Sequence, residues 1–497
     1  MHPILIIGAG PVGLTMAAEL MRYGVPVRLV DQSPEPSRTS KALVVWSRTL
    51  ELIDRMGCTG AFLDAGLQAH RAAIRSGASV LGRTGFDDIS SPYNFALMIP
   101  QCDTERLLHD HLIALGGAVE REVALTGFAQ TPSGVLATLR HADGREETVD
   151  TPWLIGCDGA HSAVRHGLGL PFDGSAEGGD WILADVRLEG EGKPPADEIA
   201  PYLHDDGPFA VFPMPSGRAR IVAAVGKVDS AQQRSQPTLD DVQRLIEERA
   251  GGGFRATDPV WLANFRINER KVADYRVGRV FLAGDSAHVH SPAGGQGMNT
   301  GMQDAFNLAW KLALVVRGEA RDILLDSYSE ERSKVGDGVL RNAKLMTDMA
   351  TLSSPIALAA RNLALRMMLG LHAVQHRMAT TMSEIDIHYA SSSLSEGKRA
   401  GRRLDPKFYS GAPPGSGPAP RWALFAANVE QATAFASRFG GFLEPAPRAP
   451  GDPDCLLIVR PDGYIGFSGD RDDWAEAERY LANIAVTDIV GNASGQP

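Results

Sequence analysis

The chain has 497 residues, 44% hydrophobic and 22% charged, a composition typical of a soluble globular protein of two or three domains. Its formal net charge of −11 argues against nucleic acid or an anionic membrane as the main partner. The four cysteines, Cys58, Cys102, Cys157 and Cys455, form no CxxC pair, which excludes a zinc ribbon and indicates a reducing compartment. The sequence shows no signal-peptide pattern and no apolar run long enough to span a bilayer, so we expect a cytoplasmic protein.

The first thirty residues carry a dinucleotide-binding pattern. A short apolar strand, Ile4–Ile7, runs directly into GAGPVG at residues 8–13, and a helix from Leu14 to Tyr23 leads to a second strand that ends at Asp31. In this pattern the first glycine makes the turn, the second lets the backbone approach a pyrophosphate and the third allows close helix packing. The terminal acid binds a ribose. A plain structural turn is the alternative, and the complete strand, helix and acid disfavour it.

Two later segments repeat the arrangement of a strand followed by an acid. One is WLIGCDG at residues 153–159, which ends in Asp158 and a glycine. The other is the buried strand Val280–Ala283, which ends at Asp285 and leads through a glycine-rich loop, residues 291–301, into an amphipathic helix. Glycines and a helix N-terminus together favour a flat polar ligand lying against exposed amides. Three strand-end acids predict a ligand stretched across the carboxyl edge of a parallel sheet.

The remaining chain predicts three further regions. Residues 173–273 contain strand-like runs, turns and one helix, Leu239–Ala250, and indicate an antiparallel sheet that covers the ligand domain. A substrate pocket is expected between the two layers. Residues 354–380 are apolar and helical, and we expect them to pack the cofactor domain against the C-terminal part; a surface helix on a membrane or partner is the alternative. After a linker rich in proline and glycine, two short strands joined by a turn at residues 460–463, with flanking helices, form a small α/β module. The candidate pocket residues, for which an ordinary core role is the alternative, are Phe209, Phe212, Pro213 and Met214.

Together, the three motifs resemble the signatures of the class A FAD-dependent aromatic monooxygenases, the p-hydroxybenzoate hydroxylase superfamily. They are the GxGxxG with its acid, CDGAHSAVR at residues 157–165, and GDSAHVHSPAGGQGMNTGMQDA at residues 284–305. LLIVRPDGYIGF at residues 456–467 resembles the C-terminal thioredoxin-like domain of larger members such as bacterial polyketide and phenol hydroxylases. Without a CxxC this domain cannot carry out thiol chemistry. The resemblance implies an α/β fold with a Rossmann-like FAD-binding domain of the GR2 type (1–172 and 274–350), an inserted antiparallel β-sheet substrate domain (173–273), a helical connector (351–405) and a thioredoxin-like domain (406–497).

The same resemblance implies how the chain holds FAD. The glycines of residues 8–13 would cradle the pyrophosphate, Asp31 the adenosine ribose and Asp285 the ribityl chain, while residues 292–299 would face the flavin pyrimidine through backbone amides. Lys41 stands where the family usually has arginine, and lysine lacks the planar fork for bidentate phosphate contacts. The residues implied to bind the cofactor are Gly8, Gly10, Pro11, Val12, Gly13, Asp31, Gln32, Lys41, Gln101, Asp158, Gly284, Asp285, Pro292, Gly294, Gly295, Gly297, Met298 and Asn299.

The family chemistry supplies the expected function. NADPH or NADH reduces FAD, oxygen adds to the reduced flavin, and the resulting hydroperoxide transfers one oxygen atom to a phenolic or polyketide-like aromatic ring. No second GxGxxG is present, so the nicotinamide cofactor is expected to bind transiently. The sequence names no catalytic side chain on the substrate side. The expected partners are a small aromatic substrate and molecular oxygen, with a homodimer left open.

Other functions remain as alternatives at this point. They are a Baeyer–Villiger or antibiotic-modifying oxygenase, a reductase, and an FAD-binding scaffold without oxygen transfer. A halogenase is disfavoured because the WxWxIP motif is absent. No metal site is expected: His288 and His290 have no third ligand at a suitable spacing, and His372 and His376 lack the glutamate of HExxH. The absence of GxSxG argues against a serine hydrolase.

Overall fold

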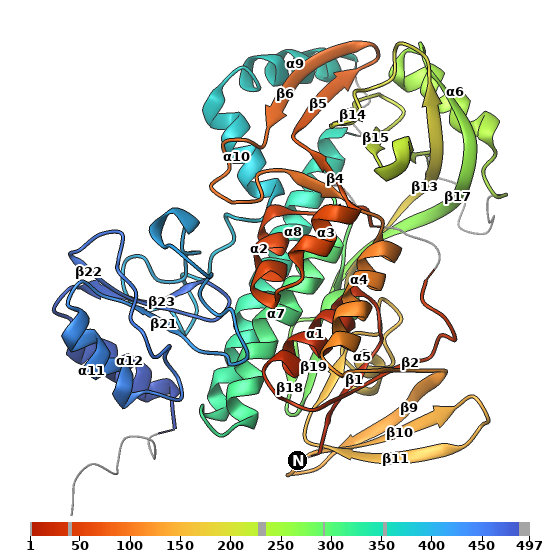
Figure 1. The fold of residues 1–497 in the computed structure, drawn as a ribbon. Coiled ribbons are helices and arrows are strands. Elements are labelled where there is room, and N and C mark those ends of the chain that lie inside the picture. Colours follow the sequence, from red (N-terminus) through yellow and green to blue (C-terminus); the bar gives the residue numbers. More distant parts are fainter. Residues whose placement is uncertain (1, 38–41, 227–234, 292–293, 351–354, 487–497) are drawn as a thin grey trace, which may run out of the picture.

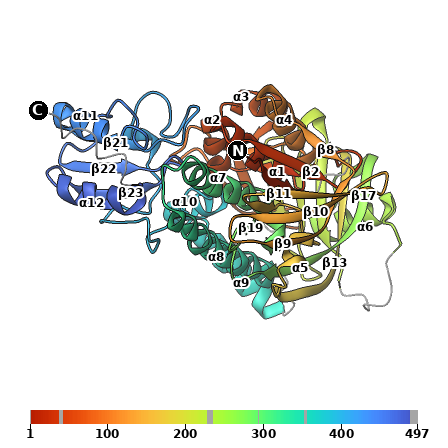
Figure 2. The same cartoon turned by 90° about the horizontal axis from the view of Figure 1, so that it is seen from below.

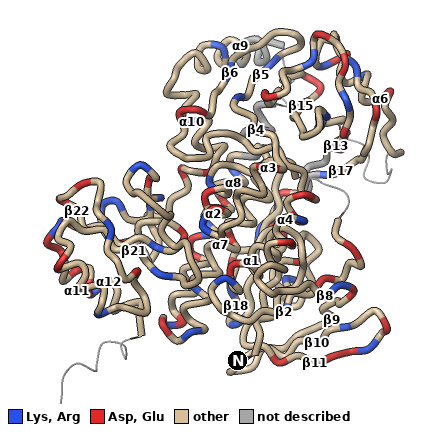
Figure 3. The backbone as a smooth tube through the Cα atoms, viewed as in Figure 1, with Lys and Arg blue, Asp and Glu red and all other residues tan. Residues whose placement is uncertain are grey.

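A computed structural model of the chain describes residues 2–37, 42–226, 235–291, 294–350 and 355–486 (Figure 1). Lys41 and Pro292, both expected to contact the cofactor, lie outside these residues, as do the side chains of residues 343–361. None of the helices in the described ranges is both long enough and apolar enough to span a membrane. Acidic and basic residues are mixed along the chain (Figure 3).

A six-stranded sheet forms the centre of the cofactor region. Its strands pair in parallel except at one edge, where β18 is antiparallel to β19. The inner strands are apolar and buried along their whole length, as strands covered on both faces require. In spatial order the strands are β18 (Arg276–Val277), β19 (Val280–Leu282), β12 (Leu154–Gly156), β1 (Ile4–Ile7), β2 (Val27–Asp31) and β8 (Val119–Arg121).

Helices and a small sheet cover this central sheet. Helix α1 (Pro11–Arg22) lies between α4 (Gln101–Ala114) and α7 (Gly297–Val316) and contacts both. Every residue of α7 from 299 to 314 is buried, because α1, α2 (Ser47–Met56) and α8 (Asp326–Ala350) all pack against it. A helix enclosed in this way needs small or apolar side chains on most of its faces, as α7 has. A three-stranded antiparallel sheet extends the region on the other side: β9 (Val123–Gln130), β10 (Val135–His141) and β11 (Glu146–Thr151).

The second large sheet has eight strands and lies at the top of Figure 1. Five strands come from the predicted range 173–273, and α6 (Leu239–Ala250) packs on them where a helix was predicted. The sheet also recruits strands from outside that range, and β5 pairs in parallel with β14. Such long-range pairing has no local sequence signal. In spatial order the strands are β20 (His288–Val289), β17 (Arg255–Lys271), β13 (Asp173–Glu189), β16 (Ala219–Ala224), β15 (Phe209–Pro213), β14 (Glu198–Tyr202), β5 (Arg71–Ser76) and β6 (Ser79–Gly85).

The helical segment that follows differs from the expectation. It forms two helices, α9 (Pro355–Met368) and α10 (His372–Met382), with Gly370 between them. Both contact β6, so they cover the edge of the second sheet instead of packing the cofactor region against the C-terminal part. Leu365 and Leu369 pack against Leu81 of β6, whereas Leu363, Met367, Met368 and Leu371 are exposed.

The C-terminal module contains the strands and helices expected from its sequence. Strands β21 (Ala423–Phe425), β22 (Cys455–Val459) and β23 (Ile465–Asp470) form an antiparallel sheet. Helices α11 (Val429–Arg438) and α12 (Trp474–Ile484) pack on it. Figure 2 shows this module on the same side of the molecule as α7 and α8. The turn at residues 460–463 is present: the amide of Gly463 donates to the carbonyl of Arg460 at 2.9 Å.

Candidate functional site

The three motifs begin side by side at one edge of the central sheet. Ile7 is in register with Gly156, and Gly156 with Leu282, so the chain leaves three neighbouring parallel strands at the same level. Asp31 is the last residue of β2, and Asp158 and Asp285 follow β12 and β19 at this edge. The carboxyl edge of a parallel sheet is where α/β proteins bind their ligands.

The structure requires glycine at two positions of the first motif for close packing, and leaves open space at the third. A Cβ on Gly8, whose φ is +98°, would lie 2.4 Å from the carbonyl oxygen of Cys157, and one on Gly13 would lie 1.8 Å from the carbonyl oxygen of Gly8. These two glycines let the loop, α1 and β12 pack closely. A Cβ on Gly10 would meet nothing within 4 Å. The space above Gly10, at the N-terminus of α1 where Pro11 occupies the first turn, fits a pyrophosphate.

Asp31 braces the glycine turn. Its Oδ2 accepts the amide of Ala9 at 2.7 Å, its Oδ1 accepts the amide of Ser33 at 2.8 Å, and Arg121 lies 3.5 Å away. Each carboxylate oxygen has a second lone pair, which leaves acceptor capacity for ribose hydroxyls. Gln32, also expected to bind the cofactor, is the next residue and is exposed.

Asp158 shapes the second motif. Its Oδ1 accepts the Ser162 hydroxyl at 2.5 Å and its Oδ2 accepts the amide of Val164 at 3.2 Å, which fixes the start of α5 (Ala163–Gly167). Burial raises the pKa of this carboxyl. Arg165 donates to the carbonyl of Ser286 at 3.1 Å, so the second motif is tied to the third. The side chain of Asp158 therefore has a structural task whether or not it also contacts a nucleotide.

The third motif packs directly on the first. A Cβ on Gly284 would lie 2.7 Å from Cγ2 of Val12, and one on Gly301 would lie 2.8 Å from the same atom. Val12 is thus a wedge between the motifs, and only glycine fits on either side of it. Asp285, expected to bind the ribityl chain, lies exposed in the short 3-10 helix η2 (Gly284–Ser286), next to the glycine that packs on Val12.

The loop before α7 is held by side chains that the sequence did not assign. Nε1 of Trp46 donates to the carbonyl of Gly294 at 3.0 Å, where Gly294 and Gly295 both have positive φ. The side chain of Asn299 accepts the amide of Trp46 at 2.8 Å and donates to the carbonyls of Val44 and Gly295. Asn299 was expected to face the flavin through its backbone amide; its side chain joins β3 (Val44–Val45) to this loop.

The N-terminus of α7 and the start of α4 complete the expected contacts. Gly297 and Met298 are the first two residues of α7, and amides at a helix N-terminus have no partner within the helix and favour negative charge. Gln101 begins α4 and braces the chain: its Oε1 accepts the amide of Ala42 at 3.2 Å and its Nε2 donates to Glu105 at 2.8 Å.

The four candidate pocket residues fall on opposite faces of the second sheet. Phe209 packs into the core beneath α6 with Val211 and other apolar residues, away from the cofactor region. Phe212 and Met214 belong to a different apolar cluster, which contains Trp46. Pro213 is buried in β15 opposite Ala219. Side chains of a strand alternate between its faces, so the odd and even positions of β15 separate in this way.

A buried ion pair on the same face as Phe212 was missed. Arg220 and Asp185 are in register, and Nε and Nη2 of the arginine contact the two carboxylate oxygens at 2.7 and 2.8 Å. Phe212 is the register neighbour of Arg220 on the other side, and the Trp261 ring lies 5.5 Å from the guanidinium. The available signal was an arginine at an alternating position of an otherwise apolar strand, residues 219–224.

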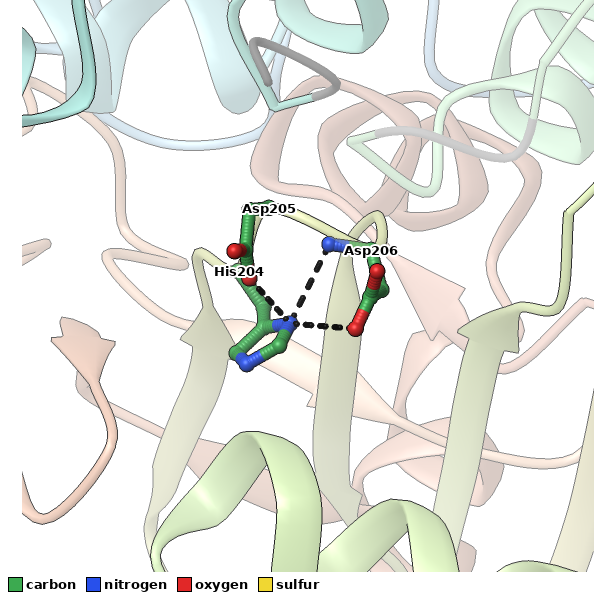
Figure 4. Close-up of side chains that lie close together, drawn as sticks. All are labelled: His204, Asp205 and Asp206. Carbon is green, nitrogen blue, oxygen red and sulfur yellow. Dashed lines mark hydrogen bonds and ion pairs between the residues drawn. The ribbon is translucent and has the colours of Figure 1, made fainter. Parts of the chain in front are cut away.

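Among the residues that the structure describes, one group of three could offer metal ligands. His204, Asp205 and Asp206 are consecutive in the turn after β14, and Nδ1 of the histidine lies 2.9 Å from Asp205 and 3.6 Å from Asp206 (Figure 4). Both acids are exposed, and the same Nδ1 is within hydrogen-bond distance of the amide of Asp206. We assign no metal to this turn. His288, considered above, is instead buried against Asp304 at 2.8 Å.

Comparisons with known proteins agree with this geometry. Residues 1–343 match the family model described as FAD binding domain. The chain is 35% identical to 6-methylpretetramide 4-monooxygenase from Streptomyces rimosus, over 94% of this chain and 91% of that protein. It is 36% identical to rifampicin monooxygenase from Streptomyces venezuelae, over 69% and 71%. The solved structure of the anhydrotetracycline hydroxylase OxyS from Streptomyces rimosus superposes with a TM-score of 0.79 at 30% identity, over 98% of this chain and 100% of that one. The chain therefore belongs to the FAD binding domain family and is a flavin-dependent monooxygenase.

Proposed function

We propose that this enzyme uses FAD and NAD(P)H to hydroxylate a phenolic, polyketide-like aromatic compound. The observation that carries the cofactor is the glycine-lined space at the carboxyl edge of the central sheet, open at Gly10 and closed at Gly8 and Gly13. Asp31 and Asp285 lie at that edge, one where a ribose and the other where a ribityl chain would extend.

The substrate class follows from the apolar face between the second sheet and the loop before α7. Phe212, Met214 and Trp46 belong to one cluster there, and Phe86 packs edge-on against Trp46 at 5.5 Å. Aromatic and sulfur-containing side chains bind planar aromatic rings well. Relatives named for 6-methylpretetramide and anhydrotetracycline support a fused polycyclic phenol as the substrate.

When bound, FAD reduced by NAD(P)H activates O₂, so that one oxygen atom enters the ring and the other leaves as water. The protein orients the aromatic ring, keeps water out and stabilises negative charge on the cofactor. The N-terminal amides of α7 suit the last task, because helix N-termini favour anions by about 0.3 to 1 kcal/mol each. The arrangement places these amides next to Trp46 and the apolar face.

For the C-terminal module we propose a thioredoxin-like fold with a structural role. Arg460 and Asp462, in the turn between β22 and β23, are buried against α7 and α8. Arg460 contacts Glu331 of α8 at 2.6 Å, and Lys311 of α7 contacts the same carboxylate at 2.8 Å. Trp310 donates to Asp462 at 3.1 Å. A surface that inserts charges between two helices of the cofactor region supports a fixed, non-catalytic attachment.

The proposed function is tested with ¹⁸O₂. The purified enzyme with FAD is given NADH or NADPH and a panel of compounds that runs from simple phenols to anhydrotetracycline. The expected result is a product with one ¹⁸O atom on the ring and one NAD(P)H consumed per product. NAD(P)H oxidation with all oxygen released as peroxide would favour a reductase. An oxygen inserted into a C–C bond would favour a Baeyer–Villiger enzyme, and bound FAD without any turnover would favour a scaffold.

A further inference from the structure

The segment that ends α10, residues 381–384, is bound to the start of α7. Nε2 of Gln296, the residue that caps α7, donates to the carbonyl of Thr381 at 2.9 Å. The carbonyl of Ser383 accepts the amide of Arg48, at the start of α2, at 3.2 Å. This segment therefore joins three elements: the helix that covers β6, the helix whose N-terminus is expected to face the flavin, and the helix that follows Trp46.

The closest connection is made by the carboxyl group of Glu384. The residue is 1% exposed. Its Oε1 lies 2.8 Å from the hydroxyl of Thr300, in the first turn of α7, and its Oε2 accepts Nε2 of Gln303, in the next turn, at 2.7 Å. Nε2 of Gln303 also donates to Thr49 of α2 at 3.2 Å. One buried carboxyl group thus fixes both the rotation of α7 about its axis and its position along that axis.

The backbone of Glu384 indicates that this side chain has a specific task. Its φ is +60°, in the left-handed region, just after the end of α10. Glycine is the favoured residue at such a helix end, because a side chain there is strained. A glutamate in this position implies that the contacts of its carboxyl group offset the strain. Function-linked strain of this kind is typical of active-site surroundings.

We propose that Glu384 is a positioning residue for FAD: it holds the first turn of α7 so that the helix N-terminus meets the flavin. This inference rests on FAD binding at the proposed site, and it adds a residue from the segment after α10, far from the three motifs in sequence. Glu384 itself touches α7 and not the cofactor site, so it acts through Thr300 and Gln303.

The protonation of Glu384 supports this role. Burial raises the pKa of its carboxyl to about 8, although hydrogen bonds from Thr300 and Gln303 and the charge of Arg332 act in the opposite direction. The Thr300 hydroxyl donates to Oε1 and Nε2 of Gln303 donates to Oε2, so both oxygens have a partner while the carboxyl group is neutral at pH 7. The charged groups around it are Arg332 from α8, Asp304 from α7, which pairs with Arg332, and Asp386 from the same loop.

Ionisation at higher pH would place a negative charge at the start of α7. The partial positive charge of the helix N-terminus favours an electron-rich flavin, and a carboxylate at the start of α7 would partly cancel it. FAD affinity of the wild-type protein should therefore fall as pH rises from 7 to 9, and a neutral side chain at this position should remove that part of the pH dependence.

The test measures the dissociation constant of FAD by titrating apoprotein and following flavin fluorescence at pH 6, 7, 8 and 9. Glu384→Gln keeps a polar side chain of the same size that can contact Thr300 and Gln303 without a charge, while Glu384→Ala removes both contacts. Glu122→Ala is the matched control, because Glu122 is also a glutamate at positive φ, 58°, but is exposed. Thermal unfolding of each apoprotein is recorded in parallel.

We expect Glu384→Gln to bind FAD at pH 7 within about twofold of the wild type and to lose the fall in affinity between pH 7 and 9. Glu384→Ala should bind FAD about tenfold or more weakly, which corresponds to about 1.4 kcal/mol. The control should bind as the wild type does. The proposal is overturned if Glu384→Ala retains wild-type affinity, or if Glu384→Gln keeps the wild-type pH dependence; the second comparison applies even if the alanine variant does not fold. A wild-type protein that binds no FAD at any pH would instead refute the proposed function.

Discussion

Gly10 and Gly13 give opposite predictions for the same small substitution. Gly10 has φ −78° and ψ −173°, values that alanine adopts readily, and its added Cβ would meet no protein atom within 4 Å. Gly10→Ala should therefore leave the apoprotein as stable as before, or more stable by about 0.4 to 1 kcal/mol through the smaller entropy of the unfolded chain. The new methyl group would, however, occupy the space assigned to the pyrophosphate.

The expected loss of FAD affinity follows from the crowding. Forcing a methyl group into a closely packed interface costs about 1 to 3 kcal/mol, which corresponds to about a five- to 150-fold larger dissociation constant for FAD. Gly13→Ala is the matched comparison. Its Cβ would lie 1.8 Å from the carbonyl oxygen of Gly8, so α1 must move away from the sheet and the apoprotein itself should lose about 3 kcal/mol or more.

Urea unfolding of both apoproteins, followed by tryptophan fluorescence, gives the free energies of unfolding, and FAD titration gives the affinities. The assignment predicts a Gly10→Ala variant that is stable but binds FAD poorly, and a Gly13→Ala variant that is poor in both. If Gly10→Ala binds FAD as tightly as the wild type, the pyrophosphate does not lie above this loop. If Gly13→Ala is as stable as the wild type, the close approach of α1 to the loop is wrong.

Three further predictions concern charge and packing. Burial alone would raise the pKa of Glu331, but the Arg460 charge beside it holds that pKa below its usual range. The ionised Glu331 therefore stabilises the folded protein above about pH 4.3, and this stabilisation is lost as pH falls. Glu331→Gln should cost about 3 to 5 kcal/mol at pH 7 and flatten the acid limb of a stability–pH curve; an unchanged curve would contradict this. The pH dependence due to Glu384 has the opposite direction, because its raised pKa means that the folded state holds the proton more tightly than the unfolded state does. The free energy of unfolding of the apoprotein should therefore fall as pH rises from about 4.3 to 8. Urea titrations of Glu384→Gln should not show this fall. Phe209→Ala should cost about 3 to 5 kcal/mol of stability with an unchanged substrate KM, whereas Phe212→Ala should raise KM with a smaller stability loss, and equal effects on KM would refute the division of faces.

The meeting of the three motifs at one edge of the sheet was predictable because each motif follows a strand with a clear sequence pattern. The runs Ile4–Ile7, Leu154–Gly156 and Val280–Leu282 are apolar on every residue but the last of the second, and only a strand covered on both faces needs that pattern. Once such strands are parallel, the residues that follow them must meet at one edge. The spacing of glycines within the first motif likewise predicts at which positions the loop packs closely against other backbone atoms.

Other features depended on pairings that no local pattern contains. Strand β5 joins the second sheet beside β14, more than a hundred residues away. The turn at Arg460 and Asp462 reads in sequence as an exposed loop, yet both side chains are buried. Burial of a charged turn depends on complementary charges elsewhere, here Lys311 and Glu331, and the sequence gives no sign that these four residues meet. The assignment of Phe209 and Phe212 to opposite faces of β15, by contrast, could have been predicted, because side chains alternate along a strand.

Helix α7 is the element through which these features act together. Its first turn is held by Glu384, and three turns later Lys311 is fixed by Glu331 between α8 and the C-terminal module. A buried ion pair contributes little net stability when it is compared with apolar packing, but it fixes one register, since a shifted helix would leave both charges unpaired. Because α7 is a rigid helix with both contacts on it, the C-terminal module constrains the same backbone amides that Glu384 positions. The module, which has no CxxC, would therefore influence the cofactor site indirectly, through the placement of α7 and not through thiol chemistry.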